Sequence, residues 1–328
     1  MKYIKSPQTD AFFNMALEEY VFESMPKDDS YFLLWQNRNA VVVGKYQNTV
    51  EEINADFVRE FGIQVVRRLS GGGAMYQDMG NVNFTYIVDQ SDAENLDFSL
   101  FTLPVVRALA QLGVTAETNG RNDIVIDGRK FSGNSQYNKK GRTMHHGTLL
   151  FDSRLETVQK ALMVKADKIS SKGIKSVRSR VTNISEHLSV EISVEDFRKV
   201  LVEKMFEENL LEEYCLTPED LKGICKLRDE KYATWEWNYG NSPAFDVRKE
   251  RRYSFGGLSL LLGSKHGRIE SLQIWGDFFG NGDVAELSAR LIGLKLEMKE
   301  LESYLEDVDL NFYIHGITQL EFIELLMI

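Results

Sequence analysis

Residues 67–84 read RRLSGGGAMYQDMGNVNF, a glycine-rich connection between two short apolar runs. The runs on either side, 63–69 and 82–88, have the composition and length of strands. Three consecutive glycines leave the backbone N–H groups unobstructed, so that they can converge on an oxyanion. Arg67 and Arg68 add donors suited to phosphate or carboxylate. A glycine triplet is also typical of a plain turn, and the spacing matches neither G-x-x-x-x-G-K-[ST] nor G-x-G-x-x-G.

The rest of the chain mixes helical and strand patterns without a regular alternation. This irregular order favours a mixed sheet flanked by helices over a regular doubly wound sheet, so we predict an α+β fold. Helical spacing runs through 12–25, 50–61, 98–112, 155–164 and 194–211, and strand-like runs lie at 32–35, 41–43, 124–126 and 143–151.

The chain has 328 residues, enough for roughly two domains. Turn residues gather at 238–243, after an aromatic segment, and they indicate a linker at 241–248. We therefore predict a catalytic domain over 1–240 and a small α+β accessory domain over 249–328, which opens with two strand-like runs.

Composition restricts the class of protein. The net charge of −10 argues against nonspecific binding to nucleic acid or to anionic membranes. No apolar run reaches the roughly 20 residues of a membrane span. The first ten residues lack an apolar h-region, so we expect no signal peptide and a cytoplasmic location. Cys215 and Cys225 cannot complete a four-ligand zinc site without suitably spaced histidines, and we predict no protein-bound metal centre.

A second group of candidate residues follows a hairpin signal. Asp127-Gly128 predicts a tight turn, which places Lys130 at the start of the returning strand. The plain interpretation is a solvated hairpin lysine. Beside Ser132-Gly133 and the glycine-rich segment, however, a lysine could reach a phosphate and a carbonyl oxygen together.

Two further patterns carry weaker signals. His145 and His146 are adjacent on a predicted strand, point to opposite faces and cannot chelate one ion, so structural or substrate-lining roles are favoured. The stretch 165–180 holds six basic residues against one acid, Asp167. Such a run is typical of a solvated face, but in an acidic protein it also fits a loop with an anionic partner.

Taken in order, these motifs closely resemble the lipoate-protein ligases of the A type, within the biotin/lipoate ligase superfamily. The resemblance covers nearly the whole chain. One departure is Gln77, where the family commonly has histidine. The motifs are RRLSGGGA at 67–74, GNVNF at 80–84, GRND at 120–123, KFSG at 130–133, HHGTLL at 145–150, KGIKSVRSRVTN at 172–183 and WEWNYGNSPAF at 235–245.

The resemblance implies a fold shared with biotin ligases and a two-step reaction. The carboxylate of lipoate attacks the α-phosphate of ATP, which carries Mg²⁺, and pyrophosphate leaves. The ε-amine of an acceptor lysine then attacks lipoyl-AMP. The implied acceptors are the lipoyl domains of 2-oxoacid dehydrogenase acyltransferase subunits and the glycine cleavage H protein, which would place the chain in lipoate salvage.

The resemblance also implies roles for individual residues. Lys130 matches the catalytic lysine that touches both the lipoyl carbonyl and the α-phosphate, where its charge offsets the developing negative charge. The loop 172–182 is expected to be mobile and to close over the adenylate. For ATP the implied residues are Arg68, Gly73, Ala74, Met75, Tyr76, Asp123, Lys130 and Arg180, and for lipoate they are Gly71, Gly72, Lys130 and His146, with Val43 nearby.

Three other functions fit less well. An octanoyl or lipoyl transferase needs a cysteine thiolate, and residues 1–214 contain no cysteine. A biotin ligase would carry an arginine-rich glycine loop in place of Ser-Gly-Gly-Gly. A non-catalytic lipoate-binding regulator would not need Lys130 or the small domain, so their presence favours turnover.

Overall fold

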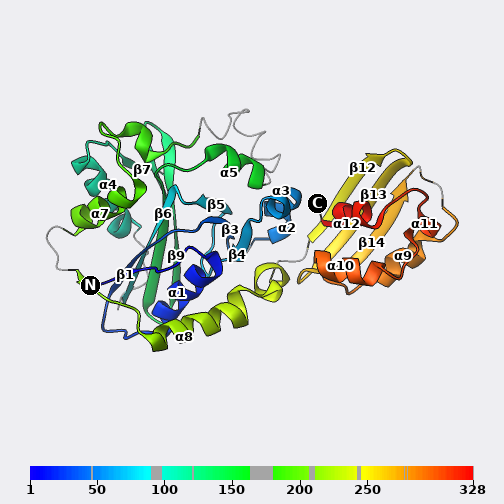
Figure 1. Ribbon diagram of the computed structural model, residues 1–328, viewed down its shortest axis with the longest axis horizontal. Helices are drawn as coiled ribbons and strands as arrows, with labels where there is room; N and C mark the ends of the chain where they lie inside the picture. The colour runs from blue at the N-terminus through cyan, green and yellow to red at the C-terminus, as the bar shows by residue number, and fades with distance from the viewer. Residues whose placement is uncertain are drawn as a thin grey trace. The chain divides into compact units, whose positions relative to one another are not determined.

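The computed structural model describes residues 1–45, 47–89, 98–119, 122–162, 180–206, 211–241, 245–276, 278 and 280–327. The chain divides into two compact units, one made of Met1–Lys45 with Gly62–Thr234 and the other of Tyr46–Phe61 with Trp235–Ile328. Each unit combines helices with strands, so the predicted α+β class is confirmed (Figure 1). The predicted division into 1–240, a linker at 241–248 and 249–328 stays a prediction.

In the first unit the strands are β1 (Lys2–Lys5), β2 (Tyr31–Trp35), β3 (Asn39–Val43), β4 (Gln64–Arg67), β5 (Met75–Asp78), β6 (Asn81–Asp89), β7 (Glu117–Asn119), β8 (Asp123–Ile126), β9 (Arg129–Lys139), β10 (Arg142–Leu150) and β11 (Glu212–Glu213). Its helices are α1 (Ala11–Ser24), α4 (Ser99–Gln111), α5 (Leu155–Ala161), η2 (Ile184–His187), α7 (Val194–Met205), α8 (Pro218–Leu227) and η3 (Arg228–Tyr232).

In the part of the first unit that the structure describes, eight strands form one mixed sheet in the order β11-β1-β2-β6-β10-β9-β8-β7. β1 and β2 are parallel, whereas β2, β6, β10, β9 and β8 pair antiparallel in turn. A second, three-stranded sheet has the order β4-β3-β5. The glycine-rich segment therefore connects β4 to β5, a strand that the sequence did not predict.

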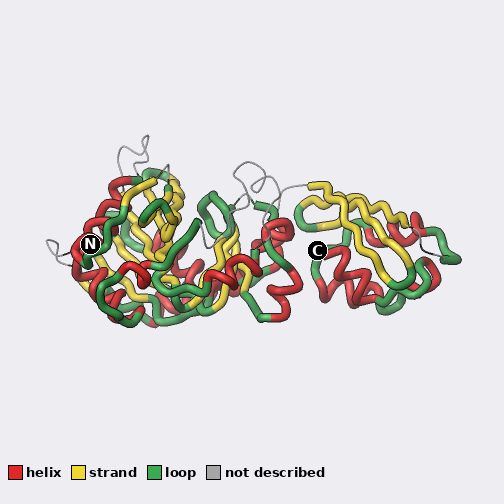
Figure 2. The backbone as a smooth tube through the Cα atoms, turned by 90° about the horizontal axis from the view of Figure 1, so that it is seen from above, coloured by secondary structure: helices red, strands yellow, loops and turns green. Residues whose placement is uncertain are grey.

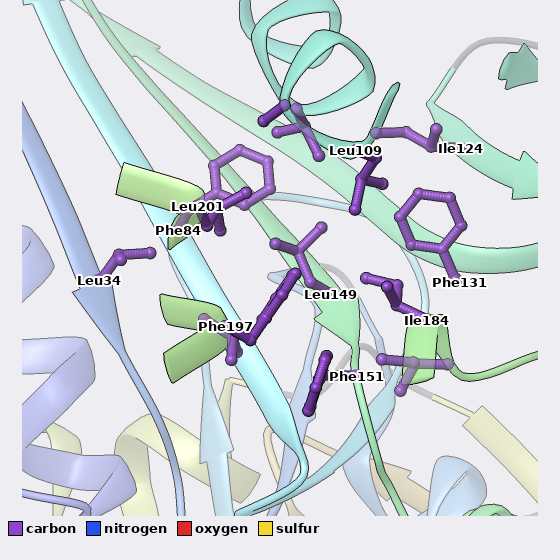
Figure 3. Close-up of a cluster of buried hydrophobic side chains, with 14 of the residues drawn as sticks. Leu34, Phe84, Leu109, Ile124, Phe131, Leu149, Phe151, Ile184, Phe197 and Leu201 are labelled. Carbon is purple, nitrogen blue, oxygen red and sulfur yellow. The ribbon is translucent and has the colours of Figure 1, made fainter. Parts of the chain in front are cut away.

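The main core lies on the face of the large sheet that α4 and α7 cover. Val82, Phe84 and Tyr86 alternate along β6 and point into this core, together with Phe197 and Leu201 of α7. Figure 3 shows Phe84, Phe197 and Leu201 within the cluster. The residues between them, Asn83 and Thr85, consequently face the other side of the sheet, where α1 packs (Figure 1).

Helix α1 begins at a side-chain cap, because Asp10 accepts hydrogen bonds from the backbone N–H groups of Phe12 and Phe13. Its helical spacing was predicted from the sequence. Asn14 and Glu18 are buried on the same face, one turn apart. The side of α1 that meets the sheet is therefore partly polar.

The second unit holds a three-stranded antiparallel sheet, β12 (Phe245–Tyr253), β13 (Gly256–Lys265) and β14 (Arg268–Gly276). Figure 2 shows the helices that follow β14, within residues 284–327, gathered on one face of these strands. None of the helices in the described ranges has the length and apolar character needed to cross a bilayer. The unit's helices are α2 (Thr49–Glu52), α3 (Ala55–Glu60), η4 (Glu236–Gly240), α9 (Val284–Leu291), α10 (Met298–Leu305), α11 (Leu310–Tyr313) and α12 (Gln319–Met327).

Candidate active site

A cavity of about 130 Å³ lies on the α1 side of the main sheet, and we call it the first cavity. Met15, Trp35 and Val42 supply its apolar wall, and Lys130 lies at its border. Trp35 is on β2 and Lys130 on β9, with β6 and β10 between them. At about 4.8 Å per strand spacing, these two strands lie roughly 14 Å apart. The cavity is thus long enough for an extended chain that ends near a cation.

The glycine-rich segment forms another wall of the first cavity, with Gly72, Gly73, Ala74 and Met75. Gly72 has φ of +95°, a backbone conformation that favours glycine. A Cβ at Gly44 would overlap with the carbonyl oxygen of Gly72. These two glycines therefore allow a close approach of two backbone segments at the cavity wall.

Arg68 holds this segment in place. Its Nη2 donates to the carbonyl oxygens of Gly71 at 2.7 Å and Gly73 at 2.9 Å, and its Nε donates to Ser70 Oγ at 3.1 Å. Burial lowers the pKa of Arg68 to about 10. Arg67 is also buried, and its Nη1 donates to the carbonyls of Gly44 and Lys45. Both arginines thus bind protein carbonyls, whereas the sequence suggested that they serve a ligand anion.

Lys130 borders a second cavity, of about 400 Å³, together with Asp123, Gly128, Arg180 and Val181. Its Nζ lies 2.7 Å from Asp123 Oδ1. The backbone N–H of Lys130 donates to the Arg180 carbonyl at 2.8 Å, which brings the 180–182 segment alongside β9. A Cβ at Gly133 would lie 2.9 Å from Lys130 Nζ, so only glycine at this position avoids a steric clash with the lysine side chain. One lysine is therefore shared by two cavities.

A chain of buried hydrogen bonds runs behind the first cavity. Glu18 Oε1 lies 3.0 Å from His146 Nδ1, and His146 Nε2 lies 2.6 Å from Ser70 Oγ. Thr85 Oγ1 donates to Glu18 Oε1 at 2.6 Å, and Trp35 Nε1 donates to Thr85 Oγ1 at 3.0 Å. We call the series Glu18, His146, Ser70 and Arg68 the Glu18 relay. It joins α1 to the glycine-rich segment.

A second buried network starts from the same face of α1. Asn14 Nδ2 donates to Asn37 Oδ1 at 2.9 Å, and Asn37 Nδ2 donates to Gln77 Oε1 at 2.8 Å. Gln77 Nε2 donates in turn to Asn83 Oδ1 at 2.9 Å. Gln77 thus accepts and donates at once, and both Gln77 and Asn83 line the first cavity.

His145 has different surroundings from its neighbour His146. Its ring stacks on Phe101 with centroids 4.5 Å apart and lies against Phe98 and Phe84. Burial lowers the pKa of His145 to about 3. As their adjacent positions on β10 predict, the two histidines lie on opposite faces of the sheet. His145 packs among aromatic rings, and His146 lines the first cavity. No group of three or more His, Cys, Asp or Glu side chains suited to a metal ion occurs in the described ranges.

Comparison with known families identifies the chain. Residues 10–206 match the model of the lipoyl protein ligase A/B catalytic domain, and residues 242–326 match that of the bacterial lipoate protein ligase C-terminus. The chain belongs to the lipoate-protein ligase family. Lipoate-protein ligase LplJ of Bacillus subtilis is 48% identical over 95% of this chain and 96% of its own. Lipoate-protein ligase 1 of Staphylococcus aureus is 45% identical over 99% of this chain and 100% of its own.

Solved structures agree with this family. A bipartite lipoate protein ligase from Thermoplasma acidophilum superimposes with a TM-score of 0.66 and 27% identity, covering 73% of this chain and 96% of that one. A lipoate-protein ligase A bound with ATP gives a TM-score of 0.62 and 25% identity, covering 73% of this chain and 98% of that one. The predicted family, ligase class and biotin/lipoate ligase-like fold are therefore confirmed.

The ligase brings most of the predicted site residues together. Two residues lie apart from both linings: the Gly71 carbonyl is bound by Arg68 and Ser135, and the Tyr76 hydroxyl donates to Asn39 at 2.9 Å. Val42, not Val43, lines the first cavity. Arg68, Gly72, Gly73, Ala74, Met75, Lys130 and His146 line the first cavity, and Asp123, Lys130 and Arg180 line the second.

Several residues of the ligase site were not found from sequence. Glu18 and Trp35 carried no motif, and Asn83 was noted only within GNVNF. The spacing of Asn14 and Glu18, four residues apart among apolar neighbours, was the available signal for α1. The predicted closing loop 172–182 and the basic stretch 165–180 lie almost wholly outside the described residues, which resume at Arg180.

Proposed function

We propose that lipoate occupies the first cavity and ATP the second, with the reacting carboxylate and α-phosphate meeting at Lys130. The observation that carries this proposal is the position of Lys130 in the lining of both cavities. The apolar side chains of Met15, Trp35 and Val42 suit a hydrocarbon tail and dithiolane. Arg180 and Lys130 supply positive charge to the second cavity, as a polyphosphate requires.

Lys130 acts in both half-reactions. Its ammonium offsets the charge that develops on the α-phosphate and carboxylate oxygens as the mixed anhydride forms and pyrophosphate leaves. When an acceptor amine attacks the lipoyl carbonyl, the same ammonium stabilises the tetrahedral oxyanion, and AMP leaves. Activation is required because a free carboxylate is a poor acyl donor.

Asp123 orients Lys130 in the absence of nucleotide, through the ion pair of 2.7 Å. Mg²⁺ usually binds proteins through one or two carboxylates while retaining contacts with substrate phosphates. The Asp123 carboxylate, which lines the second cavity, fits that requirement. Asp123 would therefore be the protein ligand for Mg²⁺ accompanying ATP, and the ion would neutralise phosphate charge there.

The remaining predicted residues fall into two groups. Gly73, Ala74 and Met75 line the first cavity, and we place the α-phosphate of ATP against their backbone, where that cavity meets Lys130. Tyr76 supports them by its bond to Asn39. Arg68 supports nucleotide binding indirectly: its guanidinium binds the carbonyls of Gly71 and Gly73 and so holds the glycine-rich segment in its conformation. Gly72 and His146 border the acyl chain.

The acceptor is a lysine on a lipoyl domain. The structure of the Thermoplasma acidophilum ligase was described together with its E2 lipoyl domain, which supports this class of partner. We extend the proposal to acyltransferase subunits of 2-oxoacid dehydrogenases and to the glycine cleavage H protein, with the reaction taking place in the cytoplasm as lipoate salvage.

Exchange of labelled pyrophosphate into ATP tests this function. Exchange should require lipoate together with Mg²⁺, and adding a purified lipoyl domain should then yield lipoylated protein and AMP. Lipoate-independent exchange, or transfer without ATP, would contradict the proposal.

A further inference from the structure

Two buried residues of the Glu18 relay, Glu18 and Ser70, have no role in the proposed function. Glu18 is 2% exposed and Ser70 is 1% exposed, and neither lines the first or the second cavity. Neither residue is therefore placed to touch a substrate. His146, which bonds to both, does line the first cavity. A buried carboxylate is costly unless it is hydrogen-bonded, so these bonds need an explanation beyond filling space.

With a neutral His146 imidazole, the donors and acceptors of the Glu18 relay have one consistent direction. A carboxylate only accepts, so the hydrogen shared with Glu18 is on His146 Nδ1. His146 Nε2 is then the acceptor for the Ser70 hydroxyl. The Ser70 oxygen, having given its hydrogen to His146, accepts from Arg68 Nε. Glu18 thereby fixes the orientation of the imidazole, and the imidazole fixes the hydroxyl that holds Arg68.

The end of the relay controls the shape of the glycine-rich segment. Arg68 Nη2 binds the carbonyls of Gly71 and Gly73 on either side of Gly72. A Cβ at Gly72 would lie 2.9 Å from the same Nη2 atom, so the guanidinium packs directly against this peptide. A rotation of Arg68 would displace the segment that we propose for the nucleotide.

A second connection from α1 reaches the other end of the same segment. Asn14 bonds to Asn37, and Asn37 bonds to Gln77, which lies in β5 just after the glycines. Ser70 and Gln77 thus bracket residues 71–76, and each is linked to the buried face of α1. The walls of the first cavity and the glycine-rich segment form one hydrogen-bonded assembly.

We propose that Glu18 is a positioning residue that couples the first cavity to the glycine-rich segment, so that lipoate and nucleotide bind cooperatively. An acyl chain in the first cavity restrains the His146 ring, and through Ser70 and Arg68 it restrains the segment before nucleotide arrives. The second ligand then loses less conformational entropy on binding. By thermodynamic linkage the effect is reciprocal. This inference rests on the proposed occupancy of the two cavities.

Calorimetric titration of lipoate, with and without saturating α,β-methylene ATP, measures this coupling directly. The analogue cannot release pyrophosphate, so both ligands remain unreacted. In the unaltered ligase we expect lipoate to bind at least about fivefold more tightly with the analogue present, the lower end of typical allosteric coupling. We call the dissociation constant of lipoate without the analogue, divided by that with it, the coupling ratio. Ser70→Ala removes one hydroxyl and no cavity wall, and it should reduce this ratio to within about twofold of unity.

In Glu18→Ala the ratio should likewise fall to near one. In Glu18→Gln it should stay close to that of the unaltered ligase, because the amide oxygen can still accept from His146. The matched control is Glu19→Ala. Glu19 is the next residue of α1, and its carboxylate binds Lys231 and Tyr232 at 2.6 Å each, on elements that line neither cavity. This control should keep the full ratio even where its melting temperature falls.

The outcomes separate this inference from the proposed function. Absence of lipoate or nucleotide binding in the unaltered ligase would overturn the proposed function itself. If both ligands bind but the ratio is near one, or if Ser70→Ala keeps the full ratio, the inference is wrong and the proposed function stands. Loss of the ratio in Glu19→Ala would also overturn it, since the effect would then be a general loosening of α1. Should Glu18→Ala not fold, Ser70→Ala decides the matter.

Discussion

Lys130 Nζ lies 2.7 Å from Asp123 Oδ1, in an ion pair between the neighbouring strands β8 and β9, and Lys130 stands where two cavities meet. The lysine extends past Gly133, where any side chain would compete for its place. The pair leaves one cation able to serve a carboxylate on one side and a phosphate on the other. Under the proposed function, this arrangement lets a single residue assist both the formation and the breakdown of an acyl adenylate.

The close approach of Gly44 to the glycine-rich segment predicts a difference between two glycine substitutions. Gly44→Ala should lower the free energy of unfolding by about 1–3 kcal/mol, because its Cβ would overlap with the Gly72 carbonyl and force the backbones apart. Gly73→Ala should leave stability nearly unchanged, since no atom lies within 4 Å of the added Cβ. Urea unfolding of both variants checks this, and equal stabilities would show that the two segments are not in contact.

The first cavity, as the proposed acyl site, predicts a limited discrimination between fatty acyl chains. Octanoate should be a usable but weaker substrate, because Met15, Trp35 and Val42 offer an apolar wall. Differences between such tails are worth only about 1–3 kcal/mol in an apolar pocket. Comparison of kcat/KM in pyrophosphate exchange measures the ratio. A higher kcat/KM for biotin than for lipoate would contradict the proposal that lipoate is the substrate.

The two cysteines are predicted to be dispensable. Cys215 is exposed and Cys225 is partly buried, and neither lines the two cavities. Replacing both with serine should therefore leave lipoyl transfer unchanged, as no thioester is involved. Transfer to a lipoyl domain, followed by mass spectrometry, is the readout. Loss of transfer with normal adenylation would instead support a cysteine acyltransferase.

His145 predicts part of the acid sensitivity of the ligase. Burial lowers its pKa from 6.5 to about 3, so between these values the unfolded chain binds a proton that the folded chain does not. The free energy of unfolding therefore has its full value, as far as His145 is concerned, above about pH 6.5. It decreases as the pH falls toward 3, by at most about 1.4 kcal/mol per pH unit. His145→Gln should reduce the change in the free energy of unfolding per pH unit in this range. His315→Gln, at an exposed position, should not reduce it. Identical slopes for all three proteins would contradict the assignment.

Local sequence signals predicted much of this architecture. Asp127-Gly128 does form the turn between β8 and β9, with φ of 50° and 71°, and Lys130 lies at the start of the returning strand as predicted, as its second residue. Strand β5 was missed because the glycines before it and Gly80 after it left only four residues, too few for a clear alternation.

The buried polar network was missed for a different reason. Glu18 is buried because it bonds to His146, a residue 128 positions away, and no local pattern contains such a pairing. Of the two arginines before the glycines, Arg68 lines the first cavity. Their partners turned out to be carbonyls of neighbouring turns, which only the folded backbone supplies.

Lys130→Met tests the central claim most directly, in two assays on one protein. Lys139→Met, at the exposed end of the same strand, is the matched control. Lys130→Met should fold normally and lower lipoate-dependent pyrophosphate exchange by about 100- to 1,000-fold, the scale for losing one charge-stabilising donor. Transfer from chemically prepared lipoyl-AMP to a lipoyl domain should slow as well, because the same ammonium serves both steps. Near-normal exchange in a folded Lys130→Met ligase would contradict the account.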